Sequence, residues 1–353
     1  MKKPAALLVN LGTPDSPQPR DVRRYLREFL MDRRVLDSFY PIRLAIVHCR
    51  ILPFQMRPAT EACHKIWQAE GSPLAVISKR VAAQLQQRVP FPVELAMRYQ
   101  NPSIESAIQN LIRQNVDELL LVPMFPHYAM SSYETAVERV RHLLKRMAPR
   151  ISLSVVPPYY EEPEYVQALV ASAAPYLEQN RGHLLFSFQG VPERHLRKTD
   201  PTRLHCLQVK NCCEKPGAAR ATCYRAQCLR TVEAFRETAG IPVRETSFAF
   251  QPGLGRGPWL QPAADLEIAR LARGGVGKLT VICPSFVTDG QETLEEIGMR
   301  GREIFLAAGG REFQLIPCLN EQALWLSFLE RLVREFASEK ADAVFSDRTT
   351  STS

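Results

Sequence analysis

The feature that most constrains this chain is the regular alternation of short apolar runs with longer segments of helical periodicity. Each apolar run is short and rich in branched or aromatic residues, as is typical of buried strands. Because strands that alternate with helices form βαβ units, the pattern predicts parallel sheets covered by helices. The expected strands span residues 5–11, 93–98, 118–123, 152–156, 183–187, 244–250, 278–283 and 313–316.

The helical segments between these strands divide the chain into two similar halves, each with four strands. A length of 353 residues also exceeds one ordinary domain. We therefore expect an α/β fold of two doubly wound domains, each with a parallel four-stranded sheet, over residues 1–165 and 166–320. A last helix at 321–336 is expected to pack back on the first domain, and the polar residues 338–353 are expected to form a disordered tail. The other expected helices span 21–31, 74–88, 103–113, 133–147, 165–179, 218–239, 263–272 and 291–307.

Composition excludes several classes of protein. Hydrophobic residues make up 45% of the chain and charged residues 23%, which excludes global disorder. No apolar run approaches the roughly 18 residues that a membrane span requires. The apolar start of the chain has no cleavage site for a signal peptidase and meets Asn10 at once, so it is interpreted as a strand. The expected compartment is the cytoplasm, with peripheral contact at the inner face of the membrane as an option.

The net charge of +8 bears on the partners of the chain. No basic run with interleaved aromatic residues is present, so nucleic acid is not an expected partner. A diffuse positive charge fits an anionic membrane surface or a substrate that carries carboxylates. The sequence does not indicate an oligomeric state.

The strand ends indicate the kind of ligand. Ligands of doubly wound folds bind beyond the carboxyl ends of the strands. No G-x-G-x-x-G motif follows a strand and no phosphate-binding P-loop is present, which argues against a dinucleotide or a nucleoside triphosphate. The strand ends are instead rich in Pro, Gly and aromatic residues, as in 123–128 (PMFPHY) and 187–192 (SFQGVP). This pattern favours a flat organic ligand.

Long motifs lie at these strand ends and elsewhere along the chain. They are 7–14 (LLVNLGTP), 22–30 (VRRYLREFL), 66–67 (IW), 71–74 (GSPL), 96–99 (AMRY), 258–262 (PWLQP), 292–297 (ETLEEI) and 317–320 (PCLN). Together these motifs resemble those of ferrochelatases. The resemblance covers about residues 5 to 335, and it implies two Rossmann-like domains that hold protoporphyrin IX and insert Fe²⁺ to give haem. It identifies the chain as an enzyme, a lyase that forms metal–nitrogen bonds.

Insertion of iron removes two pyrrole protons, so the site needs a base and a ligand for a divalent metal. The resemblance places the family's glutamate at Glu292, within an Asp-x-x-Glu-Thr motif, and the family's histidine at the position of Gln189. These two positions are the expected catalytic and iron-binding residues. The resemblance also implies that Tyr99, Met124 and Trp259 line the porphyrin pocket.

The glutamine at 189 leaves alternatives open. A glutamine amide is neither a base at neutral pH nor a good iron ligand, and His195, six residues on, is not expected to replace the missing imidazole. The leading hypothesis is a ferrochelatase whose turnover is impaired. The alternatives are a protein that binds porphyrin or haem without inserting metal, and a chelatase for another tetrapyrrole or metal. Glu295 and Glu296 either extend an acidic path from Glu292 or are solvated.

Five of the nine cysteines crowd into the insert at residues 200–228. Four thiolates from one loop suit a [2Fe–2S] cluster or a structural Zn²⁺, and the insert is similar to that of bacterial ferrochelatases with a [2Fe–2S] cluster. Neighbouring cysteines rarely both bind one cluster, so one of the adjacent pair is expected to be spare, and His205 is an alternative ligand. The expected ligands are Cys206, Cys213, Cys223 and Cys228, with Cys212 as an alternative to Cys213.

Overall fold

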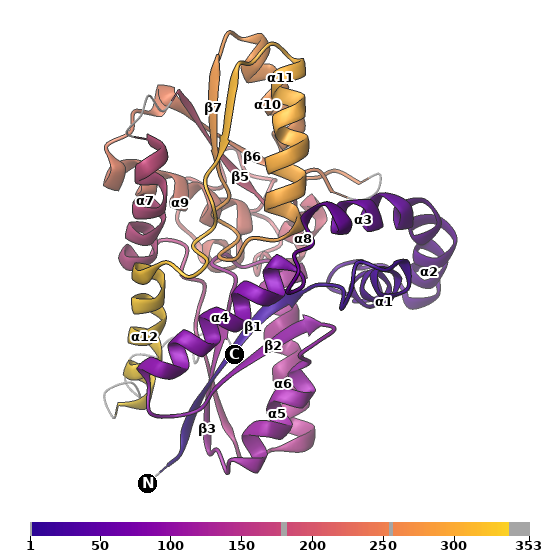
Figure 1. Cartoon of the computed structure of the whole chain (residues 1–353), viewed down its shortest axis with the longest axis vertical. Coiled ribbons are helices and arrows are strands. Elements are labelled where there is room, and N and C mark those ends of the chain that lie inside the picture. The colour runs from indigo at the N-terminus through magenta and orange to yellow at the C-terminus, as the bar shows by residue number, and fades with distance from the viewer. Residues whose placement is uncertain (1, 178–181, 254–256, 339–353) are drawn as a thin grey trace.

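The computed structural model describes residues 2–177, 182–253 and 257–338, and within them lie two parallel sheets (Figure 1). The first sheet is four-stranded with the order β2-β1-β3-β4, and the second has the corresponding order β6-β5-β7-β8. The predicted fold class is confirmed, and each strand lies within two residues of its predicted limits. The strands are β1 (Pro4–Gly12), β2 (Val93–Tyr99), β3 (Glu118–Pro123), β4 (Ser152–Val155), β5 (His183–Phe188), β6 (Thr246–Phe250), β7 (Lys278–Ile282) and β8 (Glu312–Leu315).

The central strands explain the continuous apolar runs. Leu8 of β1 pairs with a residue of β2 on one side and with a residue of β3 on the other. Phe186 of β5 is placed in the same way between β6 and β7. Because helices cover both faces of such a strand, every residue of it after the first is buried, and an alternating polar pattern does not arise. The carboxyl ends of β1 and β5 therefore lie in the middle of their sheets.

The helices follow the predicted segments, with two kinds of deviation. Segments 133–147 and 291–307 begin with a π-helix, η2 (Met130–Glu134) and η5 (Glu292–Gly301) respectively. Segment 218–239 begins with a 3₁₀ turn, η3 (Ala218–Thr222). The α-helices of the predicted segments are α1 (Pro19–Leu30), α4 (Pro73–Arg88), α5 (Ile104–Arg113), α6 (Thr135–Met147), α7 (Pro163–Leu177), α9 (Tyr224–Ala239), α10 (Ala264–Arg273), α11 (Arg302–Ala307) and α12 (Ala323–Ala337).

The sequence did not predict an arm between α1 and α4. It comprises α2 (Tyr40–Ala45), η1 (Ile46–Ile51) and α3 (Leu52–Ile66), and it projects away from both sheets (Figure 1). Its apolar residues are distributed around the helices, several of them exposed, and Pro58 lies inside α3, so no clean helical period is visible. The short α8 (Glu193–Thr199) was also not predicted. Among the described residues, no helix is both long and apolar enough to cross a bilayer.

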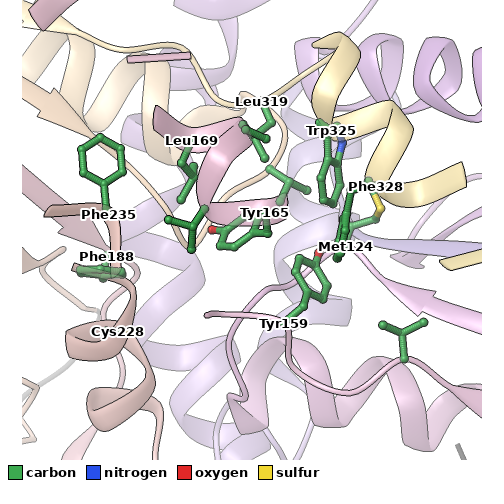
Figure 2. Packing of buried hydrophobic residues seen from close by; sticks show 14 of the residues in the cluster. Met124, Tyr159, Tyr165, Leu169, Phe188, Cys228, Phe235, Leu319, Trp325 and Phe328 are labelled. Carbon is green, nitrogen blue, oxygen red and sulfur yellow. The ribbon is translucent and has the colours of Figure 1, made fainter. Parts of the chain in front are cut away.

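One hydrophobic core joins the two sheets. Figure 2 shows Met124, next to β3, and Phe188 of β5 in the same cluster as Tyr159, Tyr165 and Trp325. The Trp325 ring lies 5.9 Å from the Tyr159 ring, centroid to centroid. Helix α12, the last helix, thus packs against the core that both halves of the chain share.

Polar contacts also hold α12 and the residues just before it against α7 and α4. Arg331 donates to Glu164 at the start of α7 at 2.8 Å, and Gln84 of α4 donates to Glu321 at 2.6 Å. The domain limits 1–165 and 166–320 stay a prediction, since the shared core crosses them. The predicted tail lies outside the described residues, apart from Ser338.

Candidate active site

Two cavities at the carboxyl ends of the strands share one wall, which contains Glu292. The larger, of about 170 Å³, lies between α1, α3 and the start of η5. The smaller, of about 20 Å³, lies beyond the ends of β1, β3 and β5. The larger is lined by Gly12, Thr13, Pro14, Val22, Tyr25, Leu26, Phe29, Ala59, Cys63, Ile66, Trp67, Ser72, Leu74, Gln291 and Glu292. The smaller is lined by Asn10, Leu11, Leu74, Met124, Phe125, Gln189, Ser285, Phe286, Val287, Thr288 and Glu292.

The structure brings together the two residues that the sequence singled out, because Gln189 and Glu292 both line the smaller cavity. Gln189 follows directly after β5, and its backbone is anchored on both sides. Its N–H donates to the Ser285 hydroxyl at 2.9 Å, and its carbonyl accepts from the Tyr224 hydroxyl at 3.1 Å. The side chain of residue 189 can therefore be changed without moving the backbone that carries it.

Glu292 is the first residue of the π-helix η5 and is partly buried. Gln251, which follows β6, donates its side-chain amide to the Glu292 carbonyl at 2.9 Å. Burial raises the pKa of the Glu292 carboxyl above its usual range. Within the described residues this carboxyl has no ion pair, so it is open to a proton or a cation from the cavity.

Asp289 does not face the cavities but fixes the start of η5. Its carboxylate accepts from the Thr293 hydroxyl at 2.9 Å and from the Asn320 amide at 2.7 Å. A Cβ at Gly290 would lie 3.4 Å from the nearer Glu292 carboxylate oxygen and 3.3 Å from Leu74. In the Asp-x-x-Glu-Thr motif, Glu292 therefore lines the cavity, while Asp289 and Thr293 hold the start of η5 in place. Position 290 leaves little space for a side chain larger than glycine.

Two further acids of η5 are also withdrawn from solvent. Glu295 is buried and pairs with Lys65 at 3.5 Å and with Arg300 at 3.1 Å. Burial raises the pKa of Glu296 to about 8, although Arg300 lies 3.5 Å from its carboxylate. Neither residue is simply solvated, and neither is among those that line the two cavities.

The three predicted porphyrin-binding residues fall in different places. Met124 lines the smaller cavity. Tyr99 is fully buried behind the larger cavity, where its ring makes an edge contact with Phe29 at 5.3 Å and its hydroxyl donates to Asp32 at 3.1 Å. Trp259 is partly buried and lies over Gly253, where a Cβ would be only 2.2 Å from the ring. Only Met124 of the three lines either cavity.

Sequence reasoning missed most of the larger cavity's wall. Tyr25, Phe29 and Trp67 supply its aromatic lining, and each lies in a motif that carried the family resemblance. Cys63 lies in the same wall, and its thiol donates to the Gln291 amide oxygen at 3.4 Å. Burial and the nearby Glu292 raise the pKa of Cys63 to about 11, so the thiol is protonated at neutral pH.

His195 does not replace the missing imidazole. It lies on α8, buried, with its Nε2 atom 3.9 Å from the Asp37 carboxylate, and it does not line the cavity that contains Gln189. Burial lowers its pKa to about 4, so the ring is neutral at physiological pH.

The five cysteines of the insert are all buried and belong to the hydrophobic core that joins the two sheets. Hydrogen bonding with the Cys223 thiol lowers the pKa of Cys206, and the Cys212 and Cys213 sulfurs lie 4.0 Å apart. Arg225 donates to the Cys213 sulfur at 3.1 Å. His205 instead pairs with the Cys212 carbonyl at 2.8 Å. In residues 2–177, 182–253 and 257–338, no three His, Cys, Asp or Glu side chains form a ready-made metal site.

Comparison with known proteins gives concordant matches. The family profile described as Ferrochelatase matches residues 3–337. A ferrochelatase of Stutzerimonas stutzeri is 47% identical over 334 residues, which are 94% of this chain and 98% of the relative. Ferrochelatases of Azotobacter vinelandii (48% identity; 94% of this chain and 98% of the relative) and Opitutus terrae (44%; 95% and 98%) match similarly.

Among solved structures, SirB from Bacillus subtilis with Fe³⁺ superimposes with a TM-score of 0.55 at 14% identity, over 97% of this chain and 98% of that one. At this identity the likeness concerns the fold alone.

Proposed function

This chain belongs to the ferrochelatase family, and we propose that it inserts ferrous iron into protoporphyrin IX at the two cavities that share Glu292. The observation that carries the proposal is the convergence of Gln189 and Glu292 on one cavity, beside an aromatic cavity lined by Tyr25, Phe29 and Trp67. The aromatic cavity supplies the apolar surface that a macrocycle requires. Glu292 supplies the one carboxylate in both walls.

The reaction replaces two pyrrole N–H protons by Fe²⁺, and Glu292 suits two parts of it. As a carboxylate it attracts the divalent metal, because oxygen ligands bind such cations. With its pKa raised by burial, the same carboxylate is also a better proton acceptor than an exposed glutamate. We assign Glu292 to the path of the metal and of the leaving protons.

Gln189 occupies the position of the family's histidine, but its amide cannot act as the base. Its amide can donate and accept hydrogen bonds, so it can position the macrocycle or the metal's water ligands, but it does not take up a proton at neutral pH. We therefore propose slow insertion of iron by this chain. We assign Tyr99 a positioning role, since it supports Phe29 from behind, and Met124 a direct contact with substrate.

The test is an anaerobic assay that follows Fe²⁺-dependent loss of porphyrin fluorescence, with porphyrin affinity measured in parallel. Slow loss that depends on both substrates is the expected result. The second candidate, a protein that binds porphyrin without inserting metal, is favoured by Gln189 alone, and it would give tight binding with no loss of fluorescence. Failure to bind any dicarboxylate porphyrin would reject both functions.

We also propose that the insert binds a [2Fe–2S] cluster through Cys206, Cys213, Cys223 and Cys228. Four buried sulfurs in one short segment fit the donor set of such a cluster, and Arg225 supplies positive charge next to Cys213. Such a cluster would tie the insert to the start of α9, where Cys228 lies. Zn²⁺ is the alternative occupant of the same sulfurs, and Cys212 is the alternative to Cys213.

The occupant of the insert is decided by the colour and metal content of anaerobically purified protein. A cluster gives visible absorption with iron and sulfide in equal amounts, and Cys223→Ser should abolish the absorption and lower the melting temperature. Cys49→Ser is the matched control, because Cys49 is an exposed cysteine of the arm. Colourless protein with stoichiometric zinc would contradict the cluster.

A further proposal is peripheral contact between the arm and an anionic membrane. Large apolar side chains are exposed on the arm and just before it, among them Phe54 at 73% and Phe39 at 75% exposure. Arg50 and Arg57 of the arm are also exposed, and Arg57 pairs with Glu61 at 2.8 Å. Such a mixture of apolar and basic residues suits the interface of an anionic bilayer. Co-sedimentation with phosphatidylglycerol vesicles tests it, and Phe39→Ser with Phe54→Ser should release the protein.

A further inference from the structure

An open cavity of about 540 Å³ lies between the arm and α8, away from the two cavities that share Glu292. We propose that it binds an anion that carries a phosphate group. It shares no lining residue with the other two cavities, so the proposal does not depend on the proposed insertion of iron. It is lined by Arg33, Arg34, Asp37, Ser38, Phe39, Tyr40, Arg43, Met130, Glu134 and Lys198.

The lining carries more positive than negative charge. Four of its side chains are cationic, and only Asp37 and Glu134 are acidic. The acids are already engaged, since Asp37 pairs with Lys198 and, at 2.5 Å, with Arg194 from α8, while Glu134 pairs with Arg34 at 2.8 Å. Within the described residues, the cations without a carboxylate partner are Arg33 and Arg43.

The burial of the Arg43 charge without a carboxylate partner is the observation that points to a ligand. It is only 8% exposed, and one of its terminal nitrogens donates to the Ser38 and Leu36 carbonyls at 3.0 and 3.2 Å. Its Nε atom has no hydrogen-bond partner in the described part of the chain. The two carbonyls and the Tyr40 ring, whose centroid lies 5.7 Å from the Arg43 guanidinium carbon, compensate part of the desolvation of this charge, but no carboxylate pairs with it. An anion in the cavity, which Arg43 lines, would supply the missing opposite charge.

The lining favours a phosphate group among anions. Arg33, Arg43 and Lys198 lie in three separate segments of the chain, and all three line the cavity. A phosphate group offers several oxygens in a tetrahedral arrangement and pairs well with arginine forks, whereas a carboxylate offers two oxygens in one plane. Two sources fit this chemistry: a free phosphate compound, and the headgroup of a phospholipid, whose chains could contact the exposed Phe39 and Tyr40.

The experiment uses pyrophosphate as the soluble probe and phosphatidylglycerol vesicles as the lipid probe, with phosphatidylcholine vesicles as the uncharged reference. Pyrophosphate binding to the full chain is measured by calorimetry, and vesicle binding by co-sedimentation. Arg33→Gln and Arg43→Gln should each weaken binding of the effective probe about tenfold, the value of one lost charge-assisted hydrogen bond. Arg50→Gln is the matched control for pyrophosphate binding, since Arg50 is an exposed arginine of the arm outside the cavity lining. For vesicles it measures the effect of removing one positive charge of the arm without altering the cavity.

Each outcome bears on the proposal. Pyrophosphate binding that is weakened by both cavity substitutions, with unchanged vesicle binding, assigns a soluble phosphate compound. Vesicle binding that falls more for the cavity substitutions than for Arg50→Gln assigns a lipid headgroup. Equal effects of all three substitutions on vesicles, with no binding of millimolar pyrophosphate, would overturn the site. If Arg43→Gln disrupts α2 and the residues before it, Arg33→Gln still tests the site. Among the described residues Arg33 makes no hydrogen bond or ion pair, so its substitution should leave the fold intact.

Discussion

The substitution Gln189→His is expected to raise the rate of iron insertion by about a hundredfold. It adds the imidazole that the glutamine position lacks, in a cavity that already contains the Glu292 carboxylate. The backbone of residue 189 is held by Ser285 and Tyr224 through hydrogen bonds that any side chain permits. The fold and the porphyrin-binding surface should therefore stay unchanged.

The magnitude follows from what the cavity already provides. A positioned general base contributes about 10²–10⁴-fold in rate, or about 2.7–5.4 kcal/mol of barrier. The lower end applies because burial raises the pKa of Glu292, which makes that carboxylate a partial base in the unsubstituted chain. An ordinary imidazole, with a pKa of about 6.5, accepts a proton at neutral pH, so the gain should disappear as the pH falls below about 6.

The assay is the initial rate of porphyrin fluorescence loss against Fe²⁺ concentration, together with the porphyrin dissociation constant. Gln189→Asn is the matched control, because it keeps the amide and should leave the rate low. Glu292→Gln in the Gln189→His background should abolish the gain, since the path would lose its one carboxylate. If the unsubstituted chain already inserts iron as fast as Gln189→His, position 189 does not hold the base and the assignment is refuted.

Three other predictions concern residues outside that pair. Burial raises the pKa of Glu296 to about 8 from its ordinary 4.5, so ionisation of Glu296 destabilises the folded state as pH rises between these values. Glu296→Gln should leave the melting temperature unchanged at pH 4 and raise it at pH 9, and equal shifts at both pH values would contradict this reading. Trp325→Ala should lower the free energy of unfolding by about 3–5 kcal/mol in denaturant titrations, because a fully buried indole is lost; a loss below about 1 kcal/mol would show that the core rearranges to fill the space. Porphyrin binding should quench the fluorescence of Trp67, which lines the larger cavity, and Trp67→Phe should remove most of the quenching; undiminished quenching would place the macrocycle elsewhere.

The sequence predicted the sheets well because their central strands are buried on both faces and leave long apolar runs. It singled out Gln189 and Glu292 because each lies at a fixed place in a motif, and both line the smaller cavity. It did not predict which motif residues face a cavity: Tyr99 is directed into the core, while Tyr25, earlier in the chain, lines the wall. A motif records which residues occur together but not the direction of each side chain.

The sequence indicated neither the arm nor the cavity between the arm and α8. Several of the arm's apolar residues face solvent while others are buried, so the periodicity that one buried helix face imposes is missing. The cavity brings Arg33 and Arg43 next to Lys198, a residue from the other half of the chain. Only the tertiary structure places such distant residues together, since no local pattern relates them.

The position of α12 determines when the chain can fold during its synthesis. Tyr159 and Tyr165 leave the ribosome long before Trp325 and Phe328, the aromatic residues that pack against them (Figure 2). At about 5–20 residues per second, the interval amounts to roughly 10–30 s. During that interval the nascent chain exposes the apolar surface that α12 will later cover. The first half should therefore depend on chaperones while it is tethered. The core that α12 shares should complete its packing only when the last helix has emerged, whereas the separate core within the first half contains no residue of α12 and can pack earlier.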